Sequence, residues 1–242
     1  MNFFHYISIY LYWKVLNLPL TINREAKTLK HTTAKRWFIF ILGIQFLAIG
    51  VIFNTRTGLG VAAFTSVFYA ISQIYGISLG TASILMYIVL IAAQTILLRK
   101  ISPAVMLQIP FSLVFGCITD VYDYIIPFHD LPVVPSFFLL FTAFVFTSLG
   151  VYLTVQCNLV VTPVEGIVNT ISRVFRFNFS IVKNVFDLSM IAITVVLCLI
   201  LKQPIMGIGI GTVLSAVMIG RLISVYQKKL VLFRDDAPGK PA

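Results

Sequence analysis

The chain has 242 residues, of which 59% are hydrophobic and 11% are charged, and its formal net charge is +10. A mean hydropathy of +0.99 leaves too little polar surface to cover a soluble globule. The composition therefore excludes a soluble domain and predicts a polytopic membrane protein. At roughly 20 residues per crossing, the length holds about six to eight membrane helices and one membrane domain.

The positive charge is concentrated at the two ends of the chain. Basic residues precede the first long apolar run and follow the last one: Lys14, Arg24, Lys27, Lys30, Lys35 and Arg36, then Arg221, Lys228, Lys229, Arg234 and Lys240. By the positive-inside rule both termini are cytoplasmic, in the cell membrane, which requires an even number of crossings. We expect the lipid bilayer, with its anionic leaflet, to be the partner of these residues, and we expect no nucleic acid.

Residues 1–36 are aromatic at first and then basic. They do not resemble a signal peptide, because no positive stretch precedes the apolar part and no small-residue cleavage site follows it. Two interpretations stay open for this cytoplasmic segment, a helix lying in the membrane interface or a loosely ordered extension. Residues 37–226 are then the membrane domain, and residues 227–242 are a basic cytoplasmic tail.

Breakers divide the membrane domain into long and short apolar runs. The runs long enough to cross are 37–55, 79–98, 104–122, 135–156, 180–201 and 205–226. Two shorter runs, 61–75 and 163–175, follow the glycine-containing stretch 54–60 and the pair Thr162-Pro163. The glycines of 207–211 have the small-residue spacing that permits close helix approach.

The order of these runs repeats about 100 positions apart. Identical residues recur at this offset, among them Phe46 and Phe146, and Gly50 and Gly150. We predict an all-α membrane bundle of two inverted repeats, 37–122 and 135–226, each with three spans and one short re-entrant helix. Eight full spans are the alternative. Only the re-entrant arrangement places Arg99, Lys100, Arg173 and Arg176 inside and Asp120, Asp123 and Asp130 outside.

Charged residues within apolar runs indicate a site. Glu165 lies in the second short run, and Lys183 and Asp187 are four apart in the following span, so they share a helical face. Asn184 lies beside them. Ionised groups at membrane depth are costly and face partners or a wet cavity. The alternative is an ion pair that only fixes two helices together, with Lys183 reaching the membrane surface.

The first half offers fewer charges. Thr65 corresponds to Glu165 by the 100-residue offset, and Asn169 follows on the second short run. Arg56 stands beside Gly58 and Gly60, where a freed helix N-terminus attracts an anionic group. These residues complete the predicted substrate site. Other polar residues, such as Ser66, Gln73 and Gln94, are most simply helix caps or interhelical hydrogen bonds.

Enzymatic chemistry is not expected. The histidines at 5, 31 and 129 lie outside the clear spans, and the sequence has no zinc-ligand spacing, nucleophile elbow or phosphate-binding loop. Asp120 and Asp123 could together hold a divalent ion for a lipid-phosphate reaction, but without a second acidic cluster the pattern is weak. We expect no cofactor and no metal.

Three stretches carry a resemblance to a known family: Asn54-Thr-Arg-Thr-Gly-Leu-Gly-Val-Ala-Ala-Phe-Thr-Ser-Val-Phe, Leu107-Gln-Ile-Pro-Phe-Ser-Leu-Val-Phe-Gly116 and Gly207-Ile-Gly-Ile-Gly-Thr-Val-Leu-Ser-Ala216. Over about residues 37–226 the chain resembles the YczE/YyaS/YitT group of bacterial integral membrane proteins, in its short, membrane-only branch. The resemblance implies a permease-like protein of the bacterial cytoplasmic membrane. It supplies no site residues.

The leading functional hypothesis is a secondary permease for a small polar or zwitterionic solute. The alternative is a non-transporting scaffold or regulator that presents its basic tails to a cytoplasmic protein partner. Both are compatible with a homo-oligomer. The solute, the direction of transport and the coupling ion do not follow from the residues.

Overall fold

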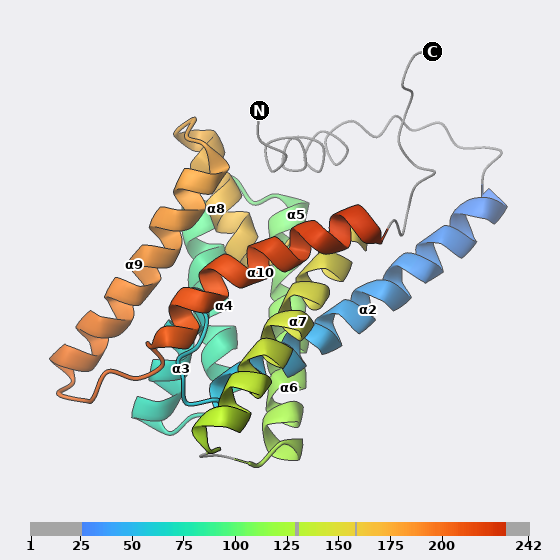
Figure 1. The fold of residues 1–242 in the computed structure, drawn as a ribbon. Coiled ribbons are helices and arrows are strands. Elements are labelled where there is room, and N and C mark those ends of the chain that lie inside the picture. Colours follow the sequence, from blue (N-terminus) through green and yellow to red (C-terminus); the bar gives the residue numbers. More distant parts are fainter. Residues whose placement is uncertain (1–25, 129–130, 158, 231–242) are drawn as a thin grey trace.

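The computed structural model describes residues 26–128, 131–157 and 159–230, and every regular element over these ranges is a helix (Figure 1). The helices are α2 (Ala26–Arg56), α3 (Ala63–Tyr75), α4 (Leu79–Leu98), α5 (Pro103–Met106), α6 (Gln108–Ile125), α7 (Val133–Cys157), α8 (Pro163–Val174), α9 (Phe179–Ile200) and α10 (Ile210–Lys229). The all-α prediction is therefore confirmed.

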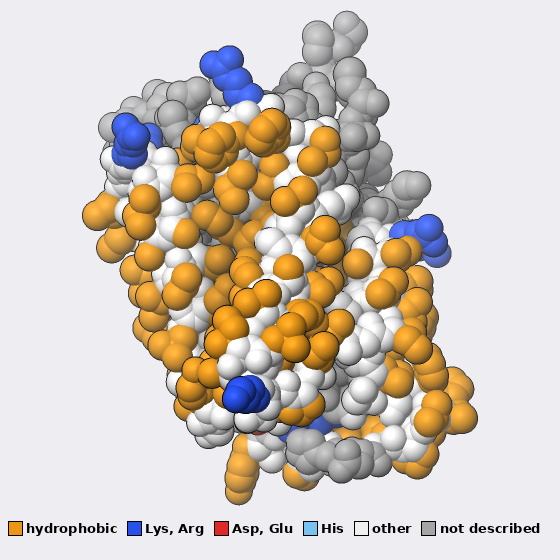
Figure 2. Space-filling model, turned by 90° about the vertical axis from the view of Figure 1, so that its left-hand side faces the viewer, with side chains coloured by type: hydrophobic (Ala, Val, Ile, Leu, Met, Phe, Trp, Pro, Cys, Tyr) orange, Lys and Arg blue, Asp and Glu red, His pale blue; other side chains and the backbone are white. Residues whose placement is uncertain are grey.

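Five helical stretches are long and apolar enough to cross a membrane. They are Ala34–Arg56, Leu79–Leu98, Pro103–Ile125, Val133–Cys157 and Ile181–Ile200. Large apolar side chains are exposed along their outward faces. Figure 2 shows one such face, a broad apolar surface on which the visible basic side chains lie at the rim. Burial in a bilayer explains an apolar surface of this extent.

Two helix boundaries differ from the sequence prediction. α2 begins at Ala26, so that residues 26–36 continue the first span as helix. The chain between Ala26 and Arg36 contains neither glycine nor proline, and nothing interrupts the helix there. Residues 1–25 and most of the basic tail lie outside the described residues.

The last helix begins later than predicted, at Ile210, and its apolar part is Ile210–Ile223. Gly207 before it has a φ of 72°, a backbone conformation that favours glycine. The Val61 N–H donates to the Gly207 carbonyl and the Gly211 N–H donates to the Leu59 carbonyl, each at 2.8 Å. The glycines thus permit the loop before α3 to approach the loop and the first turn of α10 closely.

Local sequence explains where the two short helices begin and end. α3 ends at Gly76, which is left-handed with a φ of 63°. The Thr162 hydroxyl caps the N-terminus of α8, and Pro163 occupies the first helical position. At 1.5 Å per residue, α3 and α8 are about 20 Å and 18 Å long, too short for a hydrocarbon core of about 30 Å.

The short helices lie at opposite ends of the molecule. In Figure 1, α3 is at the end where α4 begins and α9 finishes, and α8 is at the end where α4 finishes and α9 begins. α3 packs against α9, and α8 packs against α4, so each short helix contacts a long helix of the other half. A hydrogen bond of 2.8 Å between the hydroxyls of Ser66 on α3 and Thr194 on α9 crosses this boundary.

α2 and α7 form the most extensive helix pair, and their contact is reciprocal. A Cβ on Gly50 would lie 2.5 Å from the Thr147 nitrogen, and a Cβ on Gly150 would lie 2.4 Å from the Leu47 nitrogen. Each contact becomes the other when residue numbers are shifted by 100, because Gly50 corresponds to Gly150 and Leu47 corresponds to Thr147. Phe46 and Phe146 also correspond under this offset, and their ring centroids lie 5.3 Å apart. Small residues thus bring the backbones of α2 and α7 close together.

Candidate functional site

Glu165 lies on α8, Lys183 and Asp187 lie on α9, and these two helices pack against each other. Lys183 forms an ion pair with Asp187 one helical turn later. Glu165 stands in the first turn of α8, where its backbone N–H donates to the capping Thr162 hydroxyl. The Lys183 and Asp187 side chains keep 31% and 25% of their surface exposed. The pairing of Lys183 with Asp187 that their spacing predicts is present in the structure, and a shared substrate site with Glu165 stays a prediction.

The first turn of α8 rests on two buried glutamines. A Cβ on Gly166 would lie 2.5 Å from Gln108 Nε2 and 2.7 Å from Gln94 Oε1, so a larger residue would displace both side-chain ends. Gln94 is 5% exposed and Gln108 is 2% exposed, and the side-chain oxygens of both have no hydrogen-bond partner in the described residues. Buried amide oxygens normally have partners. The N-terminal end of α8 is therefore a polar position with unused acceptors.

Aromatic side chains fill the centre of the bundle. Tyr87 on α4 is 3% exposed and stacks parallel on Phe64, near the start of α3, at 5.7 Å between ring centroids. Phe111 and Phe115 on α6 also contact Tyr87, with ring centroids at 6.4 and 5.7 Å. The start of α3 thus faces packed rings rather than a wet pocket.

A polar cavity of about 610 Å³ lies instead near the end of α3, between the ends of α2 and α6. Arg56 lines it and is 8% exposed in its side chain. Its Nη2 donates to the Asp123 carboxylate at 2.7 Å and to the Asp123 carbonyl at 2.9 Å, and its Nε donates to the Ile126 carbonyl at 3.0 Å. Arg56 thus ties the end of α2 to the end of α6.

Asp120 lines the same cavity from α6 and caps α4. Its carboxylate accepts hydrogen bonds from the Gly80 N–H at 2.6 Å and from the Ser78 hydroxyl at 2.7 Å. Gly80 permits this, because a Cβ there would meet the Gly116 carbonyl at 2.0 Å. A carboxylate at a helix N-terminus is favourably placed. Asp120 and Asp123 therefore have separate partners.

The remaining predicted residues occupy different places. Thr65 is buried on α3 and 4% exposed. Asn169 is part-buried on α8. Asn184 is exposed on α9, on the same face as Ile181 and Leu188, and not with the Lys183–Asp187 pair. One residue along a helix turns the side chain by about 100°, which explains why a neighbour of Lys183 points elsewhere.

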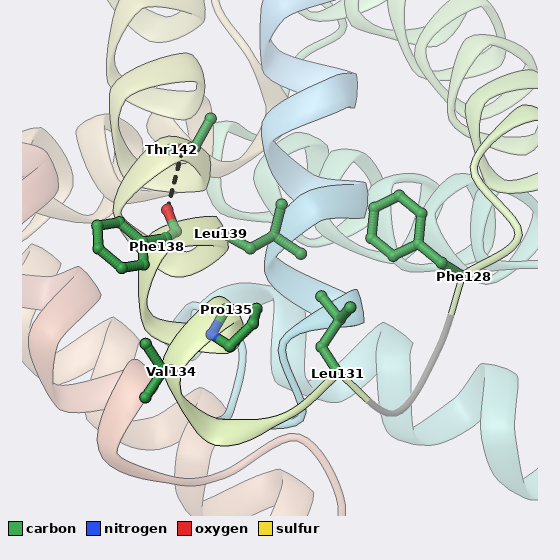
Figure 3. Close-up of a pocket in the computed structure, with 7 residues that line it drawn as sticks. All are labelled: Phe128, Leu131, Val134, Pro135, Phe138, Leu139 and Thr142. Atoms are coloured by element: carbon green, nitrogen blue, oxygen red, sulfur yellow. Dashed lines mark hydrogen bonds between the residues drawn. The ribbon is translucent and has the colours of Figure 1, made fainter.

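A second cavity, of about 520 Å³, is apolar (Figure 3). It is lined by Phe128, Leu131, Val134, Pro135, Phe138, Leu139 and Thr142. The Thr142 hydroxyl donates a hydrogen bond to the Phe138 carbonyl at 2.9 Å and so is not available to a solute. A polar solute would lose its hydration here without gaining partners. This cavity does not suit the predicted cargo.

No group of three or more His, Cys, Asp or Glu side chains that could hold a metal ion occurs in the part of the chain that the structure describes. Three features of the polar interior were not foreseen from the sequence: Gln108, the aromatic centre at Tyr87, and the pairing of Arg56 with Asp123. Gln108 falls on the buried face of α6 with Phe111 and Phe115, so helical spacing could have found it. The pairing of residues 67 positions apart has no local signal.

Helical architecture, apolar surface and polar interior together define a polytopic membrane protein. A sequence profile described as a family of unknown function, DUF6198, matches residues 34–228, and the chain belongs to this family. It is 23% identical over 197 residues to "Uncharacterized protein YyaS" of Bacillus subtilis (strain 168), covering 79% of this chain and 92% of that protein. The expected resemblance to the YyaS group is confirmed. No solved structure matches the chain.

Proposed function

We propose that the chain is a secondary permease for a small polar or zwitterionic solute, working in the cytoplasmic membrane of a bacterium with both termini inside. The observation that carries this proposal is the pair of short helices at opposite ends of the molecule, each packed on a long helix of the other half. Paired short helices in an internally duplicated bundle are the usual frame of a transport site.

The two halves are proposed to be inverted repeats. The reciprocal contacts of Gly50 with Thr147 and of Gly150 with Leu47 support a two-fold axis between α2 and α7. α10 would be the sixth crossing by its full 20 residues, about 30 Å, although its apolar part is only Ile210–Ile223. α3 would enter from and return to one face of the membrane, and α8 would do so on the other face. This topology puts Arg99, Lys100, Arg173 and Arg176 inside and the cavity with Asp120 and Asp123 outside, as the positive-inside rule favours.

The transport route is proposed to run along α4 and α6. Asp120 and Gly80 lie at its outer end and Gln94 and Gln108 at its inner end, about 21 Å apart along the 14-residue rise of α4 from Gly80 to Gln94. The rings around Tyr87 close the route between these ends. Alternating access would open these rings to one side at a time, and Glu165 would receive the solute at the inner end. No enzymatic step is included.

Uptake by membrane vesicles tests the proposal. Right-side-out and inverted vesicles containing the protein are incubated with a ¹³C-labelled extract of small polar metabolites, and the compounds that enter are identified by mass spectrometry. At least one compound should enter faster than in vesicles without the protein. Glu165→Gln and Asp187→Asn should abolish that difference, because each removes a charge from the junction of α8 and α9.

Arg176→Gln is the matched control, since it removes an exposed charge just after α8. Size-exclusion elution and thermal unfolding in micelles establish that each variant inserts and folds. If no compound enters either type of vesicle above background, the permease proposal is wrong and the scaffold hypothesis is favoured. If Glu165→Gln and Asp187→Asn transport normally, these residues only fix helices together.

A further inference from the structure

The polar cavity at the end of α3 has an unequal balance of charge. Arg56, Asp120 and Asp123 are the charged side chains among its described lining, so negative charges exceed positive ones by one. Asp123 keeps 34% of its side-chain surface exposed, whereas Arg56 keeps 8%. Its volume of about 610 Å³ is in the range of small-molecule sites. A solute in this cavity would meet carboxylates that are partly accessible and a guanidinium that is held in place.

The Arg56 guanidinium forms hydrogen bonds through two of its three nitrogens. The bonds from Arg56 to Asp123 and to the carbonyls of Asp123 and Ile126 involve Nε and Nη2. Within the described residues Nη1 has no bond, although a guanidinium has five N–H donors in a rigid fork. Nη1 is therefore an oriented donor for a carboxylate oxygen. Because the rest of the fork is fixed by α6, the donor is pre-organised.

The carboxylates offer the complementary partners. Asp120 accepts two hydrogen bonds from the start of α4, and Asp123 accepts from Arg56 through one oxygen, so each retains lone pairs. Tyr69 and Tyr124 also line the cavity. Tyrosine rings attract ammonium groups through their π faces. A cationic group is thus favoured beside the two aspartates.

We propose that this cavity binds a small zwitterion, with its carboxylate on Nη1 of Arg56 and its ammonium or quaternary ammonium group beside Asp120 and Asp123. An anion alone is disfavoured by the excess negative charge, and a cation alone leaves Arg56 Nη1 unused. The inference rests on the proposed function in that it names the class of solute, and it places the first binding site outside the aromatic centre. Binding is measurable without transport.

Isothermal titration of the purified full-length protein in micelles tests the site. The probes are three zwitterions, glycine, γ-aminobutyrate and glycine betaine, together with the single-charge compounds propylammonium and butyrate. At least one zwitterion should bind tenfold or more tightly than either single-charge compound, because it alone gains charge-assisted bonds at both ends. No preference for any of the three zwitterions would overturn the proposal.

Two variants separate the ends of the site. Arg56→Gln should weaken zwitterion binding about tenfold or more and leave propylammonium bound equally or more tightly. Asp123→Asn should weaken both the zwitterion and propylammonium, while butyrate binds equally or better. Arg56 keeps its bonds to two backbone carbonyls in the second variant, so the ends of α2 and α6 remain tied. Identical effects of both variants on all probes would mean a structural role only and would overturn the proposal.

Lys202→Gln is the control, since it removes an exposed charge that does not line the cavity. It should leave the affinity for every probe unchanged, and a loss equal to that in Asp123→Asn would overturn the assignment. The result is independent of the vesicle assay. Selective binding without uptake would leave this site standing and refute the permease, whereas uptake that survives Arg56→Gln and Asp123→Asn unaltered would refute the site and retain the permease.

Discussion

Replacing Gly50 by alanine should force α2 and α7 about 1 Å apart. The new Cβ would lie 2.5 Å from the Thr147 nitrogen and 2.4 Å from the Thr147 hydroxyl, whereas optimal heavy-atom contacts are about 3.5 Å. A gap of this size forfeits a quarter to a half of the dispersion energy of each contact it opens. Because the blocking atom belongs to the backbone of α7, rotation of a side chain cannot relieve the clash.

The expected loss of stability is about 2 kcal/mol. Overpacking costs about 1–3 kcal/mol, and the upper value applies where backbone must move. Alanine returns about 1 kcal/mol over glycine as a helix former. Gly150→Ala should lose a similar amount, since its Cβ would lie 2.4 Å from the Leu47 nitrogen in the reciprocal contact.

Reversible unfolding in mixed detergent micelles measures these free energies. Gly220→Ala on α10 is the matched control, because a Cβ there has no heavy atom within 4 Å, and it should be neutral or stabilising by up to about 1 kcal/mol. Wild-type stability in Gly50→Ala, or an equal loss in Gly220→Ala, would refute the close crossing of α2 and α7.

Three further outcomes follow from local contacts. Arg99 ends α4 at a φ of 50°, so Arg99→Gly should stabilise by about 0.5–1 kcal/mol in the same assay, and a loss would contradict the left-handed cap. A double-mutant cycle of Ser66→Ala and Thr194→Val should give a coupling of about 0.6 kcal/mol; zero coupling would exclude their hydrogen bond. Tyr122→Phe removes a 2.7 Å bond to the Gln45 side chain and should lower the unfolding free energy by about 1 kcal/mol, so an unchanged value would exclude that bond.

Much of the helix pattern could be predicted because apolar runs and breakers are local signals. Thr162-Pro163 precedes the second short helix as predicted, and the first short run, 61–75, ends at the residue where α3 ends. The start of α10 could not be placed, since Gly207 and Gly211 bind the backbone of a segment about 150 residues earlier. Helical periodicity describes one helix and says nothing of what lies across from it.

In the candidate site, too, contacts within one helix could be predicted and contacts between distant helices could not. Lys183 and Asp187 could be paired from their spacing of four, whereas the addition of Glu165 to them stays a prediction. Asn184 was included in the predicted site as their neighbour in sequence, but one residue along a helix turns the side chain by about 100°. Arg56 was noticed as a charge beside glycines, but its role depends on Asp123, which approaches only through tertiary packing of α2 with α6.

Backbone hydrogen bonds between Leu59–Val61 and Gly207–Gly211 couple the position of α10 to that of α3. α3 follows this link and packs on α9 and α10, while α8 packs on α4. Each short helix therefore packs on long helices from both parts of the chain, because α3 also contacts α4 and α8 also contacts α9. A displacement of the start of α10 would shift the chain that leads into α3 as well, since backbone hydrogen bonds join the two.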